Sequence, residues 1–423
     1  MKKPAKIYSS FRLLSLLALV ILSISARAQT CTVDWNNRHQ EIDGFGASSA
    51  WRGSLTTAQA DMFFSTNTGI GLSSLRNHIT PAGSTSSNAT PSSGEITIMQ
   101  QAQARGARVW SAPWTPAVGF KNTSGAAGGG LNGGSYNGSG NNITNLNYAS
   151  QLANYVYSMT NTYGVNIYAI SVQNEPDNIT TGYESCGWNG TQIHDFVTNL
   201  YAALVAKGVG STKIIIPESE HWSSDTALLI PTLNDSAAAA DVSIIANHNY
   251  DNCPPSGTPT QLTATKSLWE TEVSKLSCAG AFDGSITDGL YWAGRIHLFL
   301  TSAQVNAWHY WWLISDNPDN EGLTDQNGNP AQRMYVLGQW SRFVRPGYYR
   351  IDASTTGSAL VSAFNDTNSG NFVIVAVNNT SSSISQTFNL NNFPGTVSSV
   401  TPWITSATNS LTNLPPVAVS SSS

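Results

Sequence analysis

The chain has 423 residues, of which 40% are hydrophobic, 10% are aromatic and only 11% are charged. That charged fraction is less than half of the roughly 25% usual in soluble domains, whereas the apolar content is too high for a disordered polymer. A chain of this length can bury one large core or a core plus a satellite domain, which excludes a single small module.

The first 28 residues have the three parts of a secretory signal peptide. Met1–Lys3 is a basic start, Leu13–Ile24 is a short apolar run, and Ala26–Ala28 is an A-x-A cleavage site. The alternative is a membrane anchor, but the apolar run is shorter than the ~20 residues that a spanning helix needs. We therefore predict that residues 1–28 are removed and that the protein is secreted.

Removal of this segment makes the protein more acidic. It contains five of the 20 basic residues and none of the 25 acidic ones, so the net charge changes from −5 to −10. Nucleic-acid binding depends largely on lysine and arginine, and an acidic protein is poorly suited to it. We expect a monomer with no nucleic-acid partner and no membrane partner after cleavage. The abundance of Asn, Ser, Thr and Gly favours neutral, hydroxyl-rich ligands.

Four cysteines remain after cleavage, and four thiols allow three pairings. One or two disulfides are plausible in an oxidising compartment, and Cys253 with Cys278 is the preferred pair because both flank the same two predicted elements. The other two cysteines are Cys31 and Cys186. No C-x-x-C spacing occurs, so a zinc site is not expected, nor any other metal or cofactor.

Eight short apolar runs alternate with segments long enough to form helices. The runs are Glu41–Phe45, Leu72–Ile79, Arg108–Trp114, Ile167–Gln173, Lys213–Pro217, Val242–Tyr250, Ser267–Val273 and Val305–Trp312. Helical patterns lie between several of them, at Tyr148–Tyr163, Thr191–Lys207 and Asp288–Thr301. Strands alternating with helices indicate parallel strands, and eight such units over about 300 residues predict an α/β fold of the (β/α)₈ TIM-barrel type.

The two chain ends have a different pattern. After Pro346 the sequence shows short alternating runs separated by Ser, Thr, Asn and Gly, which is typical of an all-β domain. The strand-like segment Cys31–Trp35 precedes the first barrel strand and can join this domain. The predicted organisation is an N-terminal side-domain strand over 29–40, a catalytic barrel over 41–345, and a β-sandwich side domain over 346–423. The terminal serines indicate either a linker to a further module or a truncated domain.

Ionisable residues at the ends of barrel strands are the first candidates for catalysis, because active sites of this fold lie at that face. The fourth predicted strand ends at Asn174, Glu175 and Pro176. The seventh ends with Glu270 and Glu272, which alternation places on one side, with Glu272 nearer the mouth.

Two carboxylates facing one cleft are what glycoside cleavage requires: an acid that protonates the leaving oxygen and a partner on the other face of the sugar. Asn174, next to Glu175, can hydrogen-bond a sugar hydroxyl, and Pro176 fixes the turn. For a single glutamate, a paired surface residue would be the better interpretation. The combination on opposing strands favours catalysis.

Several segments resemble glycoside hydrolase family 30, within the retaining clan whose acid/base and nucleophile lie on strands four and seven. The matching segments are Gly44–Ala47, Leu75-Arg76, Ser111–Pro116, Tyr168–Asp177, Pro217–Ser219, His248-x-Tyr250, Trp269–Glu272, Trp311-Trp312 and Phe343–Gly347. The resemblance implies a barrel with a β side domain built from both chain ends, and a secreted endo-xylanase that acts on plant cell-wall polysaccharide. It also implies Glu175 as acid/base and Glu272 as nucleophile, whose carboxyl groups should lie about 5–5.5 Å apart.

Further residues are candidates for binding substrate or positioning the carboxylates. Arg76 and Tyr250 can hold Glu272 ionised, although either can be a structural hydrogen-bonding group. His248 lies two residues before Tyr250 and should face the same way, as a substrate contact or a core histidine. Flat faces for sugar rings are offered by Trp51, Trp114 and Trp312. Trp311 alternates away from Trp312 and is expected to pack outward against helices.

The sequence departs from the family pattern at two places. Members that depend on glucuronate carry an arginine soon after the paired tryptophans, but here residues 313–321 contain no base and the three acids Asp316, Asp319 and Glu321. Like charges repel, so we predict no requirement for a glucuronate substituent. The second departure is Glu270, where related sequences usually have an apolar residue. We interpret it as a hydrogen-bonded neighbour of Glu272.

Other functions remain open at this stage. An endo-β-1,6-galactanase or a β-glucosidase-type family member would use the same chemistry on another glycan. A carbohydrate-binding barrel without activity is disfavoured because both carboxylates are present. A structural cell-wall β-protein would leave the eight barrel units without a role.

Overall fold

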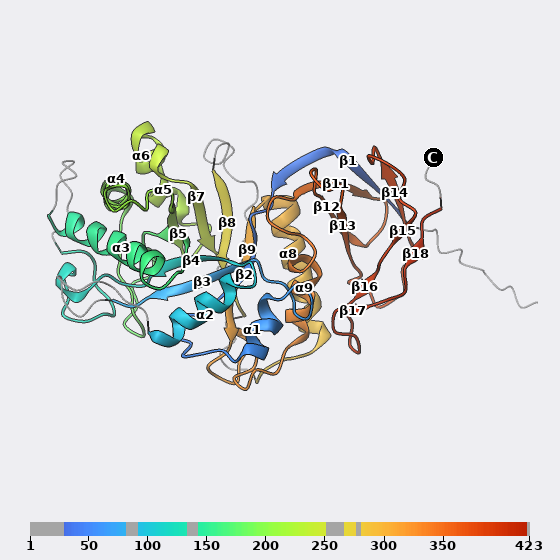
Figure 1. Cartoon of the computed structure of the whole chain (residues 1–423), viewed down its shortest axis with the longest axis horizontal. Coiled ribbons are helices and arrows are strands. Elements are labelled where there is room, and N and C mark those ends of the chain that lie inside the picture. The colour runs from blue at the N-terminus through green and yellow to red at the C-terminus, as the bar shows by residue number, and fades with distance from the viewer. Residues whose placement is uncertain (1–28, 82–91, 133–142, 251–265, 276–280, 421–423) are drawn as a thin grey trace, which may run out of the picture.

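The computed structural model describes residues 29–81, 92–132, 143–250, 266–275 and 281–420, with only the backbone for 143–147. Figure 1 shows two parts, a barrel with surrounding helices and a smaller β domain beside it. The predicted signal peptide and the cysteines Cys253 and Cys278 lie outside the described residues. Cys31 and Cys186 are buried free thiols.

Eight parallel strands close into a barrel. They are β2 (Gly44–Ser48), β3 (Ser74–Ile79), β4 (Arg108–Pro113), β5 (Ile167–Ser171), β6 (Lys213–Ser219), β7 (Ile244–His248), β8 (Ser267–Glu272) and β9 (Ala307–Ile314). Each pairs with the next, and β9 pairs with both β8 and β2 to close the ring. The short β10 (Gly322–Thr324) adds to β9 in parallel. All eight predicted runs therefore correspond to barrel strands.

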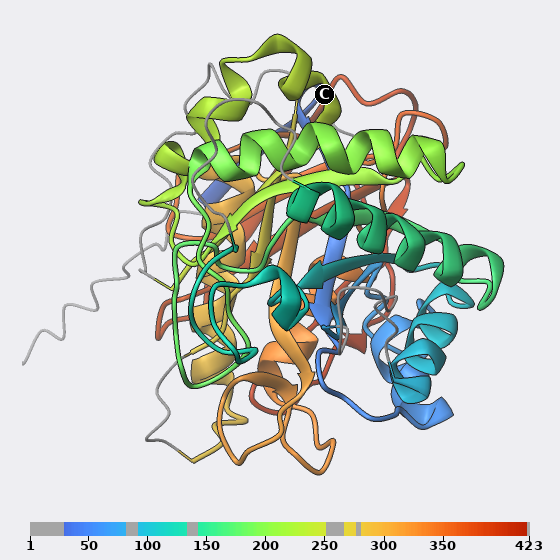
Figure 2. The same cartoon turned by 90° about the vertical axis from the view of Figure 1, so that its left-hand side faces the viewer.

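Helices surround the barrel. They are α1 (Thr57–Phe64), α2 (Ser93–Gln103), α3 (Ile143–Asn161), α4 (Gly190–Ala206), α5 (Asp225–Leu233), α6 (Ser236–Asp241), α8 (Ile286–Leu298) and α9 (Gln332–Ser341). Several of them begin at a side chain that accepts backbone N–H groups, as α1 does at Thr56 and α4 at Asn189, each within a capping box. Figure 2 shows α3 and α4 running side by side. Among the described helices, none is long and apolar enough to cross a membrane.

Both chain ends build the side domain. Strand β1 (Gln29–Glu41) lies between β11 (Tyr349–Thr355) and β14 (Gln386–Asn391), and β12 (Leu360–Asn365) and β13 (Phe372–Val377) complete a five-stranded sheet. Two small sheets follow, β15 (Ser399–Val400) with β18 (Val417–Ala418) and β16 (Trp403–Ile404) with β17 (Thr412–Asn413). The predicted fold class, a TIM barrel with an all-β side domain from both ends, is confirmed.

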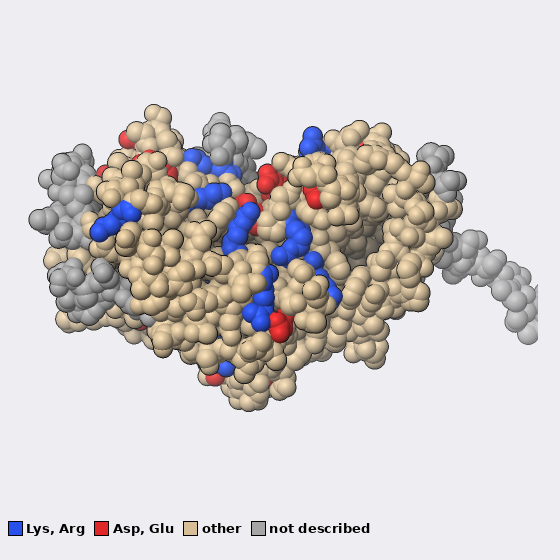
Figure 3. All heavy atoms as spheres, in the orientation of Figure 1, with Lys and Arg blue, Asp and Glu red and all other residues tan. Residues whose placement is uncertain are grey.

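Helices α8 and α9 lie between the barrel and the side domain (Figure 1). From α9, the buried Trp340 donates its indole N–H to Ser362 of β12 over 3.1 Å. Gln339 reaches Thr405 beyond β16 over 2.8 Å. The side domain is thus anchored to the outer helices. Figure 3 shows that the visible face carries few charged side chains, as the composition predicts.

Candidate active site

Three barrel strands contain an extra residue close to their carboxyl ends. Where β6 pairs with β7, Pro217 and Ser219 face consecutive partners, so Glu218 is inserted. The same irregularity inserts Thr271 in β8 and Trp311 in β9. Such β-bulges redirect neighbouring side chains and are frequent beside active sites. Here they surround the end at which the predicted catalytic residues lie.

Glu175 follows β5 in an unusual backbone conformation, with φ of +45°. Its N–H donates to the carbonyl oxygen of Glu218 over 2.8 Å. One carboxylate oxygen lies 2.9 Å from Nδ1 of His248, and the other accepts from Asn178 at 3.1 Å and Tyr183 at 3.0 Å. A non-glycine residue at positive φ is strained, and such strain is concentrated at functional sites.

Glu272 ends β8 and is 5% exposed. Arg76 of β3 donates to one of its oxygens, and Tyr250 donates to the other over 2.8 Å. The Arg76 guanidinium is fully buried and also donates to Asn174 over 2.5 Å. These four residues were predicted for the site from sequence, and the structure brings them together.

A third carboxylate, Glu218, lies beneath the other two and is completely buried. Its Oε1 accepts from Arg76 over 2.5 Å and lies 3.4 Å from Nε2 of His248. Burial alone would lower the pKa of Arg76, but Glu218 and Glu272 raise it. The charged guanidinium of Arg76 therefore donates to both Glu218 and Glu272.

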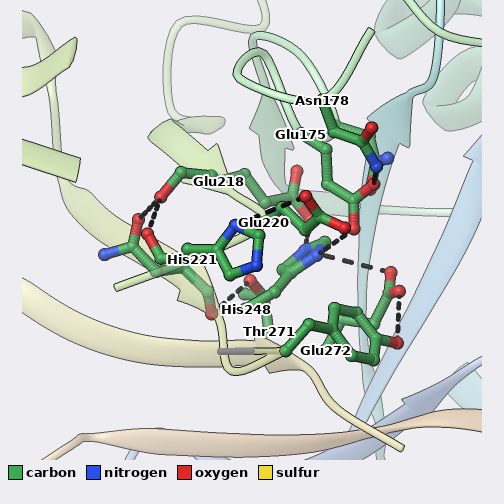
Figure 4. Close-up of polar contacts among 12 residues, drawn as sticks. Glu175, Asn178, Glu218, Glu220, His221, His248, Thr271 and Glu272 are labelled. Atoms are coloured by element: carbon green, nitrogen blue, oxygen red, sulfur yellow. Dashed lines mark hydrogen bonds and ion pairs between the residues drawn. The ribbon is translucent and has the colours of Figure 1, made fainter. Parts of the chain in front are cut away.

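His248 lies among three carboxylates, as Figure 4 shows. Nδ1 is 2.9 Å from Glu175, and Nε2 is 3.4 Å from Glu218 and 3.9 Å from Glu272. Both ring nitrogens face acceptors, which only the imidazolium form can satisfy. Burial would lower the pKa of His248, but the carboxylates raise it to about 10. His248 is thus a buried cation rather than a neutral core histidine.

The two predicted catalytic carboxyls are close enough for the charge of each to affect the titration of the other. Burial raises the pKa of Glu175, but the hydrogen bond and charge of His248, with Asn178 and Tyr183, outweigh it and lower the pKa. For Glu272, burial and the charge of Glu175 outweigh His248 and Arg76, so its pKa is raised. A proton shared by the pair therefore favours Glu272 in the free protein.

One oxygen of Glu175 and one of Glu272 lie within 4.8 Å of each other. A sugar carbon and its glycosidic oxygen fit between carboxylates at such a separation, whereas inverting glycosidases need about 6.5–9.5 Å to admit water. Glu175, His248 and Glu272 also have donor spacing compatible with a metal ion. A protonated His248 has no lone pair for a metal, and Arg76 occupies Glu272, so this set is poorly suited to one.

Aromatic side chains line the site on the β2, β4 and β9 side. Trp51 is 40% exposed, and its ring centroid lies 5.1 Å from that of Trp114 and 6.4 Å from that of Trp312. Trp114 stacks against the Arg76 guanidinium at 4.3 Å. All three predicted sugar platforms therefore lie in one cluster, next to the Arg76 guanidinium that contacts Glu272.

The prediction that Trp311 packs outward is wrong. Its ring stacks on Trp312 with centroids 4.9 Å apart, and it lies 5.8 Å from Trp114. The Arg76 guanidinium lies 5.6 Å from its centroid. The β-bulge at Trp311 breaks the alternation on which the prediction depended.

Glu270 is fully buried and has partners different from those of Glu272. Glu270 accepts from the indole N–H of Trp222 over 2.6 Å, and the Trp222 ring packs against that of Phe299, which directly follows α8. The bulge at Thr271 interrupts the alternation that placed both glutamates on one side. Glu270 is a hydrogen-bonded neighbour, and the cluster around Arg76 and His248 contains Glu272 instead.

The acidic segment after Trp312 borders the site. The backbone N–H of Trp312 donates to the carbonyl of Glu321, and burial with the charges of Asp319 and Glu272 raises the pKa of Glu321 to about 7. At the rim, Asp316 forms an ion pair with Arg52, with 3.6 Å between nitrogen and oxygen.

Sequence reasoning missed three residues of the cluster. Glu218 lay within a family-like segment, but nothing in its spacing indicated a buried ion pair. Asn178 and Tyr183 follow Glu175 by three and eight residues, and this proximity in the loop after β5 was the signal that could have identified them.

Comparisons with known proteins agree with this geometry. A scan against protein-family models found no match. The chain is 32% identical over 399 residues to glucuronoxylanase XynC of Bacillus subtilis (strain 168), spanning 91% of this chain and 86% of the relative. It matches the glycoside hydrolase family 30 subfamily 8 xylanase Xyn30A of Clostridium acetobutylicum with a TM-score of 0.80 and 31% identity, covering 92% of this chain and 94% of that one. A GH30 endoxylanase from Clostridium papyrosolvens C71 matches with a TM-score of 0.75 and 30% identity, covering 92% and 95%.

Proposed function

The chain belongs to glycoside hydrolase family 30, and on that premise we propose that it is a retaining endo-β-1,4-xylanase that does not require a glucuronate side group. The resemblance found in the sequence is thereby confirmed. The observation that carries the proposal is the pair Glu175 and Glu272, with oxygens within 4.8 Å and separate sets of donors. Xylanases among the relatives support the substrate class.

The reaction proceeds by double displacement. The Glu272 carboxylate attacks the anomeric carbon while the glycosidic C–O bond breaks and Glu175 gives its proton to the leaving oxygen. Water then attacks the anomeric carbon of the glycosyl-enzyme, Glu175 takes a proton from that water, and Glu272 is released as a carboxylate. Arg76 and Tyr250 hold Glu272 in position for attack.

The first step needs the shared proton on Glu175, whereas in the free protein it favours Glu272. A glycosidic oxygen can only accept hydrogen bonds. Bound beside Glu175, it therefore stabilises the protonated form of that carboxyl. Substrate binding thus moves the proton toward the residue that must donate it.

The acidic segment supports independence from glucuronate. Asp316, Asp319 and Glu321 follow Trp312 without a basic residue, and the rim arginine Arg52 is already paired with Asp316. A glucuronate carboxylate in this region would be repelled by Asp319 and, above about pH 7, also by Glu321. Unsubstituted and arabinose-substituted xylan would meet none of this repulsion.

The test is hydrolysis of linear xylan, arabinoxylan, glucuronoxylan, β-1,6-galactan and β-glucan by the purified protein, with identification of products. We expect xylo-oligosaccharides from all three xylans, with the β-anomer appearing first by ¹H NMR. Cleavage of glucuronoxylan alone would refute independence from glucuronate. A first-formed α-anomer would refute retention, and turnover of galactan or glucan alone would identify another family activity.

We also propose that the enzyme is secreted and acts as a monomer. The basic start, apolar run and A-x-A site of residues 1–28 support export. N-terminal sequencing of the protein from the culture medium of its expression host should begin at Gln29. Size-exclusion chromatography with light scattering should give the mass of one chain.

A further inference from the structure

Glu218 occupies an unusual place in the barrel. It is the inserted residue of the β6 bulge, and its backbone has φ of +58°, a left-handed value that a glutamate adopts at a cost. Its carbonyl oxygen accepts the N–H of Glu175, whose own φ is also positive. The main chain at Glu218 therefore fixes the backbone of Glu175.

Its side chain reaches the other half of the site. Glu218 contacts Arg76 at 2.5 Å and His248 at 3.4 Å, and these two cations hold Glu272 and Glu175 respectively. Glu218 is thus hydrogen-bonded to both cations. Glu218 is 0% exposed and cannot touch a polysaccharide.

We propose that Glu218 is a positioning residue that holds Arg76 and His248 in place and, through its charge, sets the pH range in which Glu175 and Glu272 carry the protonation states that catalysis needs. This inference rests on the proposed function.

Charge explains the second part of the proposal. The cluster contains three carboxylates and two cations, so one net negative charge is buried when all are ionised. Loss of the negative charge of Glu218 would stabilise the ionised forms of both catalytic carboxyls, since the two cations would then serve two anions. The pKa values of both catalytic carboxyls would fall.

The test compares Glu218→Gln with the wild-type enzyme on the best xylan of the substrate panel. The variant keeps the shape and an acceptor oxygen but loses the charge. We expect kcat to fall by about tenfold or more at nearly unchanged KM. We also expect both limbs of the pH–kcat/KM profile to move to lower pH, by on the order of one unit.

Glu95→Gln is the matched control. Glu95 is also a buried glutamate near β3, 3% exposed, and accepts from the Ser49 hydroxyl and the His78 N–H at 3.2 Å each. Burial raises its pKa to about 8, so glutamine replaces a neutral group below that pH. Glu95→Gln should leave both pH limbs in place.

Wild-type kcat and unmoved limbs in Glu218→Gln would overturn the inference. If that variant does not fold, Glu218→Asp replaces it as the test, because aspartate keeps the negative charge on a shorter side chain. A several-fold lower kcat at constant KM supports positioning by Glu218, and wild-type kcat refutes it. ¹⁵N-histidine NMR separates this inference from the proposed function, because the pKa of His248 should fall by on the order of one unit in Glu218→Gln even if no xylan is cleaved. An unchanged His248 pKa would contradict the inference.

Discussion

Two buried histidines differ in charge according to their place in the barrel: His248 lies at the carboxyl end of β7, here called the mouth, and His309 lies near the start of β9, here called the floor. His248 at the mouth faces carboxylates with both ring nitrogens, and its pKa is raised to about 10. His309, deeper on β9, donates from Nδ1 to the Glu270 carbonyl over 3.0 Å and accepts at Nε2 from Trp110 over 3.2 Å. Burial lowers its pKa to about 4.

Both side chains are 0% exposed, so burial alone does not decide their charge. Neighbouring carboxylates favour the imidazolium at the mouth, whereas the indole N–H of Trp110 at the floor requires a neutral acceptor. The floor around His309 is packed with neutral hydrogen-bonded side chains, whereas the mouth around His248 contains the ionised groups of the proposed active site.

The largest effect is expected from the two carboxyls of the proposed mechanism. In that mechanism Glu272→Gln removes the attacking group, and Glu175→Gln removes the proton donor. Each should lower kcat on xylan by more than about a thousandfold, while thermal unfolding shows a folded protein. Glu270→Gln is the matched control on the same strand. A greater loss in Glu270→Gln than in Glu272→Gln would reverse the assignment of the nucleophile.

Acid stability tests the neutral floor. The pKa of His309 is about 4 in the folded state and about 6.5 when unfolded, so the unfolded chain gains the proton first. The neutral His309 contributes fully to the free energy of unfolding above pH 6.5. This contribution, on the order of 3 kcal/mol, is lost as pH falls toward 4. His309→Gln should be less stable at pH 7 but lose less stability on acidification. Urea unfolding at pH 4.5 and 7 measures both. Equal pH slopes would show that His309 is not the group responsible.

Replacement of His248 should change the pH dependence of activity, because its charge acts on the two carboxyls of the proposed mechanism. His248→Gln removes a cation 2.9 Å from Glu175 and 3.9 Å from Glu272. The pKa values of both carboxyls should rise, moving both limbs of the pH–kcat/KM profile to higher pH by about one unit. We expect kcat to fall by about 10- to 100-fold. His309→Gln should leave the limbs unmoved, and a downward shift in His248→Gln would contradict a cationic mouth.

The smallest effect is expected at the rim. Arg52 and Asp316 are 28% and 46% exposed in their side chains, and exposed pairs contribute little. Asp316→Ala should change the free energy of unfolding by less than about 1 kcal/mol. Chemical denaturation measures this change, and a loss of several kcal/mol would place the rim pair among the structural elements of the site.

Local sequence patterns determined much of the protein. Apolar runs alternating with helical segments were sufficient for the eight-stranded barrel, because strand and helix periods depend on neighbouring residues only. A carboxylate just after the fourth run and another near the end of the seventh placed Glu175 and Glu272 at the same end of the barrel. The side domain followed from short alternating runs at the chain ends.

Only the tertiary structure decided how the side chains meet. The bulges at Glu218, Thr271 and Trp311 break the two-residue alternation, so sequence counting misplaced Trp311 and missed Glu218. Likewise, the charge of His248 depends on carboxylates from β5, β6 and β8, which approach it only when the barrel closes. A sequence contains the ionisable groups, but their pKa values are set by distances that the closed fold creates.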